Sequence, residues 1–138
     1  MFESAELGHK IDKEPFKKEV PLLRAALLDA QYDMPEKKDF PVVIPISGAD
    51  GSATGETIHP LYSWMDPRHI STLAFSEPSD EERARPYMWR YWRALPPKGK
   101  VGIFAGSWYS QPITDRINGD MRRSELDERL DDINRFEA

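Results

Sequence analysis

Three short, largely apolar runs along the chain predict β-strands. The three runs occupy residues 40–47, 70–75 and 101–106. The first, FPVVIPIS, has the unbroken hydrophobicity that is typical of a strand buried on both faces of a parallel sheet. Pro45 fits this strand poorly, because proline cannot donate a hydrogen bond to a neighbouring strand.

Between and around these runs, apolar residues recur at helical spacing. The pattern predicts helices over residues 19–34, 55–65, 76–95 and 124–138. Pro21 suits the first turn of the first helix. In the third helix, Ser79 and Glu82 form a capping-box pair and Pro86 predicts a bend. We expect Ser124 to cap the last helix.

The alternation of strands and helices predicts an α/β fold with a parallel sheet flanked by helices. Three strands are few for a sheet covered on both faces. The last helix ends at Ala138 without a glycine cap. We therefore expect an incomplete domain, the N-terminal part of a longer protein; a frayed C-terminal helix is the alternative. Leu126, Leu130 and Ile133 then predict an exposed apolar face.

Composition narrows the class of protein. The 138 residues carry a net charge of −5, which disfavours a protein that coats DNA or RNA. Fifteen aromatic residues can anchor a core, and the absence of cysteine excludes disulfides and thiolate metal sites. Neither a signal peptide nor an apolar stretch of membrane-spanning length is present. We expect a cytoplasmic protein without DNA or membrane partners.

The segment GADGSATGET, residues 48–57, lies where a phosphate-binding loop would lie, after a strand and before a helix. Gly48, Gly51 and Gly55 could supply backbone N–H groups, Thr54 a hydroxyl, and Asp50 a carboxylate for a cation. Such loops normally contain a lysine, and this one has none. A structural turn between strand and helix is the alternative.

A second candidate is a cluster of positive charge in an otherwise acidic chain. It comprises Arg83, Arg85, Arg90, Arg93, Lys98 and Lys100. Arginine suits bidentate contact with phosphate. The alternative is a solvated helix face that pairs with nearby acids, with Trp89 and Trp92 packed inward. Ser107, after the third strand, could approach a bound phosphate at the carboxyl edge of the sheet.

These pieces together resemble the second family of polyphosphate kinases, most closely the polyphosphate:AMP phosphotransferases. The family's loop has the pattern G-x-D-x-x-G-K-G, which Gly48, Asp50 and Gly55 match. The sequence departs from it at Ala53, where glycine is expected, and at Thr54, where lysine is expected.

Further matches follow in the same order along the chain. Pro67 and Arg68 resemble the family's N-P-R turn, and Ser107 begins its S-W-Y motif. A longer match is carried by Pro78, Glu81, Trp89, Arg90, Leu95, Pro96, Gly99 and Phe104. Ala105 and Gly106 stand where the family usually has Asp-Arg.

The resemblance implies a P-loop kinase-like core over residues 41–138, preceded by a lead-in and helix over 1–40. It also implies transfer of a phosphoryl group from polyphosphate to AMP, giving ADP, with Mg²⁺. The implied phosphate contacts are Gly48, Gly51, Thr54, Gly55, Arg68 and Arg90. Asp50 would be the catalytic and magnesium-linked carboxylate.

Loss of the charged residues predicts that this copy is catalytically degenerate, because phosphoryl transfer depends on cations that cancel charge on the moving group. Two alternatives remain open: a residually active kinase module, and a non-catalytic interaction or dimerisation domain. Expected partners are polyphosphate, AMP or ADP, and a second domain or a homo-oligomer.

Overall fold

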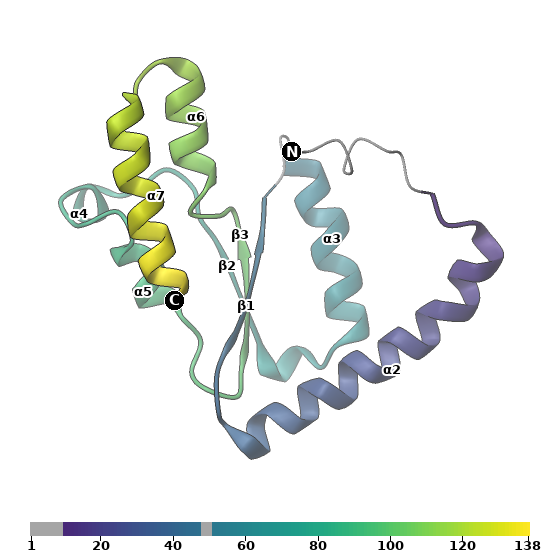
Figure 1. The fold of residues 1–138 in the computed structure, drawn as a ribbon. Coiled ribbons are helices and arrows are strands. Elements are labelled where there is room, and N and C mark those ends of the chain that lie inside the picture. The colour runs from purple at the N-terminus through teal and green to yellow at the C-terminus, as the bar shows by residue number, and fades with distance from the viewer. Residues whose placement is uncertain (1–9, 48–50) are drawn as a thin grey trace.

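Three parallel strands form the centre of the fold (Figure 1). The computed structural model describes residues 10–47 and 51–138. The strands are β1 (Val42–Ile46), β2 (Ile70–Ala74) and β3 (Val101–Ala105), in the spatial order β1-β3-β2. The helices are α2 (Lys13–Lys37), α3 (Gly51–Trp64), the 3₁₀ turn η1 (Pro67–His69), α4 (Asp80–Arg83), α5 (Trp89–Ala94), α6 (Ser110–Asn118) and α7 (Arg123–Glu137). All three strand predictions are therefore confirmed.

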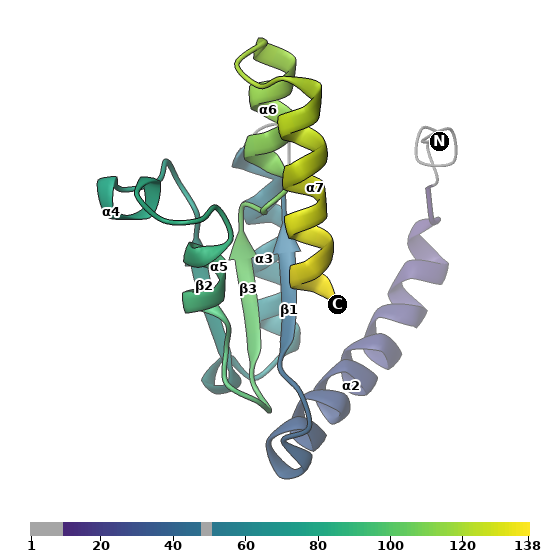
Figure 2. The same ribbon diagram turned by 60° about the vertical axis from the view of Figure 1, so that its left-hand side comes forward.

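The helices cover both faces of the sheet, so the predicted three-layer α/β fold is confirmed (Figure 2). Alternate residues of β3 supply the two halves of the core, because successive side chains of a strand point to opposite faces. Val101 and Ile103 pack with α2 and α3 on one face. Phe104 packs with Tyr91 and Ile133 on the other.

Pro45 is tolerated because of the direction in which it points. The Val42 N–H donates to the Lys100 carbonyl at 3.1 Å, and the Ile46 carbonyl accepts from the Gly106 N–H at 2.8 Å. Alternate residues of a parallel strand bond to the same neighbour, so Pro45 turns its missing N–H away from β3. β1 lies at the edge of the described sheet, where proline costs no hydrogen bond to a neighbouring strand.

Helix α2 is longer than predicted, and Pro21 lies inside it rather than in its first turn. Only its second half packs on the sheet, through Leu27 and Met34. The first half projects away from the remaining elements in both ribbon views (Figures 1 and 2). It leaves Phe16 and Leu22 exposed, the latter at 72%.

The single bent helix predicted over 76–95 is wrong. The segment forms two short helices, α4 and α5, with Pro86 between them. The predicted capping box is confirmed: the Ser79 N–H donates to Glu82 Oε2 at 2.8 Å, and the Glu82 N–H donates to Ser79 Oγ at 3.3 Å. Tyr91 is buried, whereas Trp92 is exposed, contrary to the inward packing considered for it.

The C-terminal segment forms a hairpin of α6 and α7 (Figure 1). Helix α7 begins at Arg123, and the Glu125 side chain accepts from the Arg122 N–H at 2.6 Å, so Ser124 is not its cap. Ile133 is buried in the core, which contradicts the predicted exposed stripe, although Leu130 is exposed. The stretch between β3 and α7 contains the helix α6.

Candidate functional site

The carboxyl edge of the sheet is the candidate site, because the ends of all three strands meet there. β1 leads into the predicted phosphate loop, of which Gly48 and Asp50 lie outside the described residues. Gly51 is the first residue of α3, and Thr54 and Gly55 lie in its first turns. The glycine-rich stretch is thus partly helix rather than loop, and the helix N-terminus adjoins the end of β1.

Arg90, on α5, reaches back to the end of β2. Its Nη2 donates to the Ser76 carbonyl at 3.0 Å, and its Nε lies 3.4 Å from Glu82 Oε1 without hydrogen-bond geometry. The guanidinium lies 5.2 Å from the Phe75 ring centroid, and the side chain is only 11% exposed. Arg90 Nε is therefore a buried N–H with no hydrogen bond among the described residues.

Two hollows adjoin Arg90. The smaller, about 170 Å³, is lined by Phe75, Ser76, Glu77, Pro78, Tyr87, Arg90, Tyr91, Gly106, Ser107, Ser110 and Gln111. The larger, about 310 Å³, shares five of these residues and continues between α4 and the α6–α7 hairpin. The arginines Arg83, Arg85 and Arg129 add positive charge to its lining, and the acids Glu77, Glu82 and Asp115 add negative charge.

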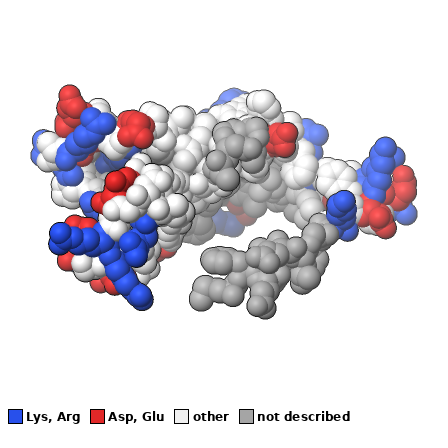
Figure 3. Space-filling model, turned by 90° about the horizontal axis from the view of Figure 1, so that it is seen from above, with Lys and Arg blue, Asp and Glu red and all other residues white. Residues whose placement is uncertain are grey.

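The other cluster arginines have partners of their own. Arg83 pairs with Asp80 at 3.1 Å, and Arg85 and Arg93 both lie over the Trp89 ring. Figure 3, seen from above this edge, shows blue and red side chains interspersed over α4 and the α6–α7 hairpin. Of these three arginines only Arg83 pairs with an acid, whereas Arg85 and Arg93 stack on Trp89, so the alternative interpretation is supported in part.

Tyr87 joins the wall of the hollows to the core. Its hydroxyl donates to the Trp108 carbonyl at 2.6 Å, and the Arg129 guanidinium lies 4.6 Å from its ring centroid. Burial raises the pKa of Tyr87 far above its ordinary value, so the hydroxyl stays protonated and keeps donating. Tyr87 is consequently a fixed structural element of the site.

The C-terminus of α7 fixes the turn that follows β3. Glu137 Oε1 accepts from Trp108 Nε1 at 2.8 Å and from the Tyr109 hydroxyl at 2.6 Å. The hydrogen bond to Glu137 raises the pKa of Tyr109. These contacts hold the α6–α7 hairpin beside the hollows.

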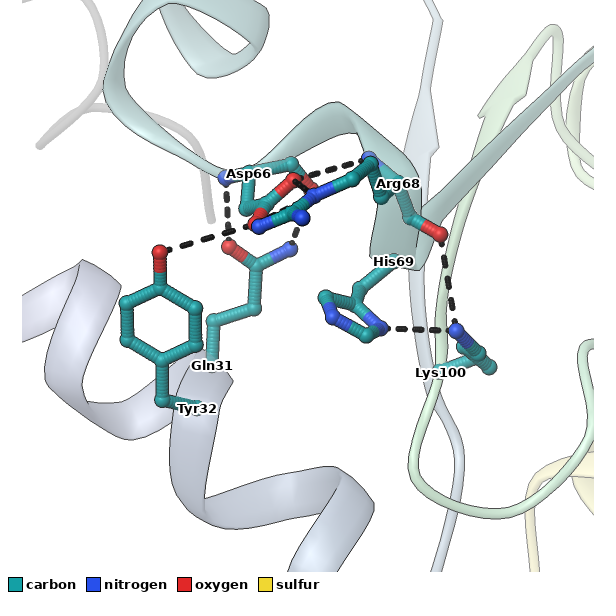
Figure 4. Close-up of polar contacts among 6 residues, drawn as sticks. All are labelled: Gln31, Tyr32, Asp66, Arg68, His69 and Lys100. Atoms are coloured by element: carbon teal, nitrogen blue, oxygen red, sulfur yellow. Dashed lines mark hydrogen bonds and ion pairs between the residues drawn. The ribbon is translucent and has the colours of Figure 1, made fainter.

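Arg68, the other predicted phosphate arginine, lies at the opposite edge. Arg68 precedes β2, whereas Arg90 contacts Ser76, which follows β2. The strand between these two positions spans roughly 16 Å at about 3.3 Å per residue. Arg68 Nη2 donates to Asp66 Oδ2 at 2.6 Å, and Arg68 Nε donates to Asp66 Oδ1 at 3.0 Å (Figure 4). The structure therefore does not bring Arg68 together with Arg90.

Asp66 is in turn held by Gln31 of α2. The Asp66 N–H donates to Gln31 Oε1 at 2.7 Å, and Gln31 Nε2 donates to the Asp66 carbonyl at 2.9 Å (Figure 4). Gln31 is 2% exposed. Hydrogen bonds from the Arg68 side chain and backbone hold the pKa of the Asp66 carboxyl well below its ordinary value. This cluster fastens α2 to the turn before β2.

The backbone conformation of Gly106 disfavours the arginine that the family usually has at this position. Its φ is +94°, and a Cβ at this position would lie 3.0 Å from the Phe75 carbonyl oxygen. Non-glycine residues rarely adopt such a φ. An arginine at position 106 thus requires a different course of the turn after β3.

The described residues do not provide a metal site by themselves. No group of three or more histidine, aspartate or glutamate side chains among them is arranged to hold a metal ion. Asp50, the predicted magnesium carboxylate, lies outside the described residues, so its role stays a prediction. No chemical step below depends on a metal.

Ser47 and Ser110 also lie at this edge. The sequence pattern indicated only Ser107 there. Ser110 begins α6, and Ser47 directly follows β1. No sequence spacing links the two, because they are 63 residues apart. Their proximity follows from the pairing of β1 with β3.

A parallel sheet whose first strand leads through a glycine-containing segment into a helix, with an arginine-lined hollow at that edge, is typical of phosphate-binding α/β proteins. Comparison with known proteins gives the family. The chain belongs to the polyphosphate kinase 2 (PPK2) family, whose sequence profile matches residues 10–138.

Among curated relatives, the polyphosphate:AMP phosphotransferases of Pseudomonas aeruginosa and Pseudomonas syringae pv. tomato are 51% and 45% identical over 99% of the chain. The chain spans 28% of the length of each.

Solved structures agree. A structure from Pseudomonas aeruginosa PA01, assigned to polyphosphate kinase 2, superimposes with a TM-score of 0.90 at 51% identity, covering 99% of this chain and 29% of that one. Polyphosphate kinase 2 from Arthrobacter aurescens TC1 superimposes with a TM-score of 0.84 at 26% identity. The match covers 95% of this chain and 48% of that one. Within residues 10–47 and 51–138, no helix combines the length and apolar character needed to cross a membrane.

Proposed function

We propose that this chain is a polyphosphate-binding domain of a protein that transfers phosphoryl groups from polyphosphate to AMP, giving ADP. Family membership and the names of the two Pseudomonas relatives support this activity for the parent protein. The residues proposed to contact phosphate are Gly48, Gly51, Thr54, Gly55 and Arg90, with Asp50 as the magnesium carboxylate. Arg68 is no longer part of the proposal, because it lies at the other edge.

One observation carries the binding proposal: Arg90 has a buried N–H without a hydrogen bond, beside two hollows at the carboxyl edge. A buried donor that makes no hydrogen bond costs about 1–3 kcal/mol. Because that Nε is shielded from solvent and lies 3.4 Å from Glu82 Oε1, a phosphate in the hollows would contact the part of the Arg90 side chain that lines them. Charge-assisted bonds of this kind are stronger than neutral ones.

We propose that the domain binds polyphosphate without catalysing transfer. Thr54, Ala105 and Gly106 occupy positions where the resembled family carries charge. Removal of one preorganised charged group commonly lowers a rate by about 10²–10³. Such losses are not additive, so three of them cannot simply be multiplied.

The exposed N-terminal half of α2 also favours a role in binding a second domain or a second copy of the chain. Phe16, Leu22 and Leu23 lie uncovered on a helix that makes few contacts with the rest of the described chain. Exposed apolar residues grouped on one element commonly mark an interaction surface. The predicted second domain or homo-oligomer remains the proposed partner.

The binding proposal is tested by calorimetric titration with medium-length polyphosphate at about 0.05 M and about 0.5 M salt. Arg90→Gln should weaken binding at low salt by about tenfold or more. Arg93→Gln removes the same charge from the same helix, but Arg93 stacks on Trp89 and lines neither hollow. It should change the affinity by less than about twofold.

Because Arg90 also packs on Phe75 and Tyr91, Arg90→Lys serves as a second variant that keeps charge and stem. It should bind with intermediate affinity. Absence of binding by the wild-type chain at low salt, or equal losses in the two glutamine variants, overturns the proposal. In a separate assay, ADP formation from polyphosphate and AMP should be undetectable; turnover within about a hundredfold of an intact family member would support a residually active module.

A further inference from the structure

Three serine hydroxyls gather beside Arg90 at the carboxyl edge. Ser47 Oγ and Ser110 Oγ lie 2.7 Å apart, and Ser110 Oγ lies 3.4 Å from Ser107 Oγ. Ser107 is 7% exposed, whereas Ser47 is exposed. The cluster joins the end of β1 to the turn between β3 and α6.

Hydrogen-bond accounting leaves a donor available in this cluster. The Ser107 N–H donates to Ser110 Oγ at 3.4 Å, and the Ser47 hydroxyl can donate to the same oxygen. A hydroxyl oxygen accepts two bonds and donates one. If Ser110 Oγ accepts from the Ser47 and Ser107 hydroxyls, its own proton is left for another acceptor. Ser107 Oγ accepts from the Tyr109 N–H at 3.2 Å, and its own proton is then used in the bond to Ser110.

The Ser110 hydroxyl can donate its proton into the smaller hollow. Ser107 and Ser110 line the 170 Å³ hollow together with Arg90 and Gly106, and Ser47 does not. Arg90 extends to this hollow from α5, and its Nε is buried. Ser107, Ser110 and Arg90 thus line one hollow, to which Glu77 adds a carboxylate.

We propose that Ser110, held in place by Ser107, binds a phosphate group of the polyphosphate chain through its neutral hydroxyl donor, at the edge where the charged pair is replaced by Ala105 and Gly106. The inference rests on the proposed polyphosphate binding and adds two residues to that site. The hydroxyl contributes affinity that salt does not screen, since it carries no charge.

The experiment compares two variants that remove the same hydrogen bond. Ser110→Ala and Ser47→Ala both abolish the contact between β1 and α6, but only Ser110 lines the hollow. With tripolyphosphate as the probe, Ser110→Ala should weaken binding about three- to tenfold, the effect of one neutral hydrogen bond. Ser47→Ala should stay within about twofold, and Ser110→Thr, which keeps the hydroxyl, should restore most of the affinity.

Salt provides a second readout. The ratio of affinities between wild type and Ser110→Ala should be the same at about 0.05 M and about 0.5 M salt, whereas the ratio for Arg90→Gln should fall as salt rises. Thermal denaturation of each variant checks that the fold is kept.

Each other outcome overturns the inference. Equal losses in Ser47→Ala and Ser110→Ala show that the serines only tether α6 to β1. Binding that depends on Arg90 but not on Ser110 overturns the hydroxyl contact and leaves the proposed function standing. No binding of tripolyphosphate or of longer polyphosphate by the wild-type chain overturns both.

Discussion

Each edge of the sheet carries an arginine that the sequence predicts to contact phosphate. The two arginines differ in their exposure and in their hydrogen bonds. Arg68 is 78% exposed, yet Asp66 occupies its Nε and Nη2. Arg90 is 11% exposed, yet its Nε makes no hydrogen bond among the described residues. An exposed arginine is thus satisfied at the amino edge, and a buried one remains unsatisfied at the carboxyl edge.

This difference separates a structural charge from the charge that we propose binds phosphate. At the amino edge, Asp66, Arg68 and Gln31 satisfy one another and fasten α2 to the sheet. At the carboxyl edge, the strand ends leave hollows beside Arg90. The positive charge of a residue therefore does not indicate a ligand unless its hydrogen-bonding capacity is also left unused.

The largest expected effect tests the amino edge as a structural clamp. Gln31→Ala should lower the free energy of unfolding by about 2–4 kcal/mol, because it leaves the buried Asp66 N–H without a partner and removes one of the two hydrogen bonds that the Asp66 carbonyl accepts, the other coming from the His69 N–H. Tyr32→Phe is the control, since the Tyr32 hydroxyl lies 3.5 Å from Asp66 Oδ2 and is exposed. It should cost less than about 0.5 kcal/mol in urea denaturation. Equal costs for the two would show that Gln31 is not the fastening.

The next effect tests whether the carboxyl edge can regain its charge. Gly106→Arg should destabilise the fold by about 1–3 kcal/mol, because φ is +94° and the new Cβ meets the Phe75 carbonyl. Thr54→Lys adds the other missing cation within α3, where the backbone is ordinary helix, and should change stability by less than about 0.5 kcal/mol. Thermal denaturation of both variants measures the contrast. A Gly106→Arg protein as stable as wild type would mean that the turn readily adopts another course.

The comparison of the two arginines gives a direct binding test. Arg68→Gln should leave the affinity for polyphosphate within about twofold of wild type, whereas Arg90→Gln lowers it by about tenfold or more. The reason is position, since the two variants lose the same charge at opposite ends of β2. Titration calorimetry at low salt compares them. If Arg68→Gln weakened binding as much as Arg90→Gln, affinity would come from overall charge rather than from the carboxyl edge.

The smallest effect is a dependence on pH that belongs to the amino edge alone. Since the pKa of Asp66 is lowered by Arg68, its ionised form contributes stability that is present above the ordinary carboxyl pKa of about 4. The stability difference between wild type and Asp66→Asn should be full near about pH 7 and shrink as the pH falls below about 4. The difference for Ser110→Ala should not change, because a hydroxyl does not titrate there. Urea denaturation at several pH values measures both.

Much of the fold could be predicted from the sequence, because each strand is a short and largely apolar run between turn residues, although only β3 is mostly buried. The capping box at Ser79 was also predictable, since both of its partners lie within one turn. The division of 76–95 into α4 and α5 was not, because it depends on Tyr91 and Met88 packing on Phe104 rather than on local helix preference. The length of α2 was missed because proline normally disfavours a helix interior and suits a first turn, whereas α2 begins at Lys13 and continues through Pro21.

By itself, the sequence determined the class of fold, the family and the missing charges at Thr54, Ala105 and Gly106, because these are properties of residue order and type. Only the tertiary structure decided which edge each arginine occupies, and which serines meet. Arg68 and Arg90 look alike as residues, but the direction of β2 places them at opposite ends of the sheet. Ser47 and Ser110 meet because β1 and β3 pair in parallel, a contact between residues far apart in the chain that no local pattern encodes.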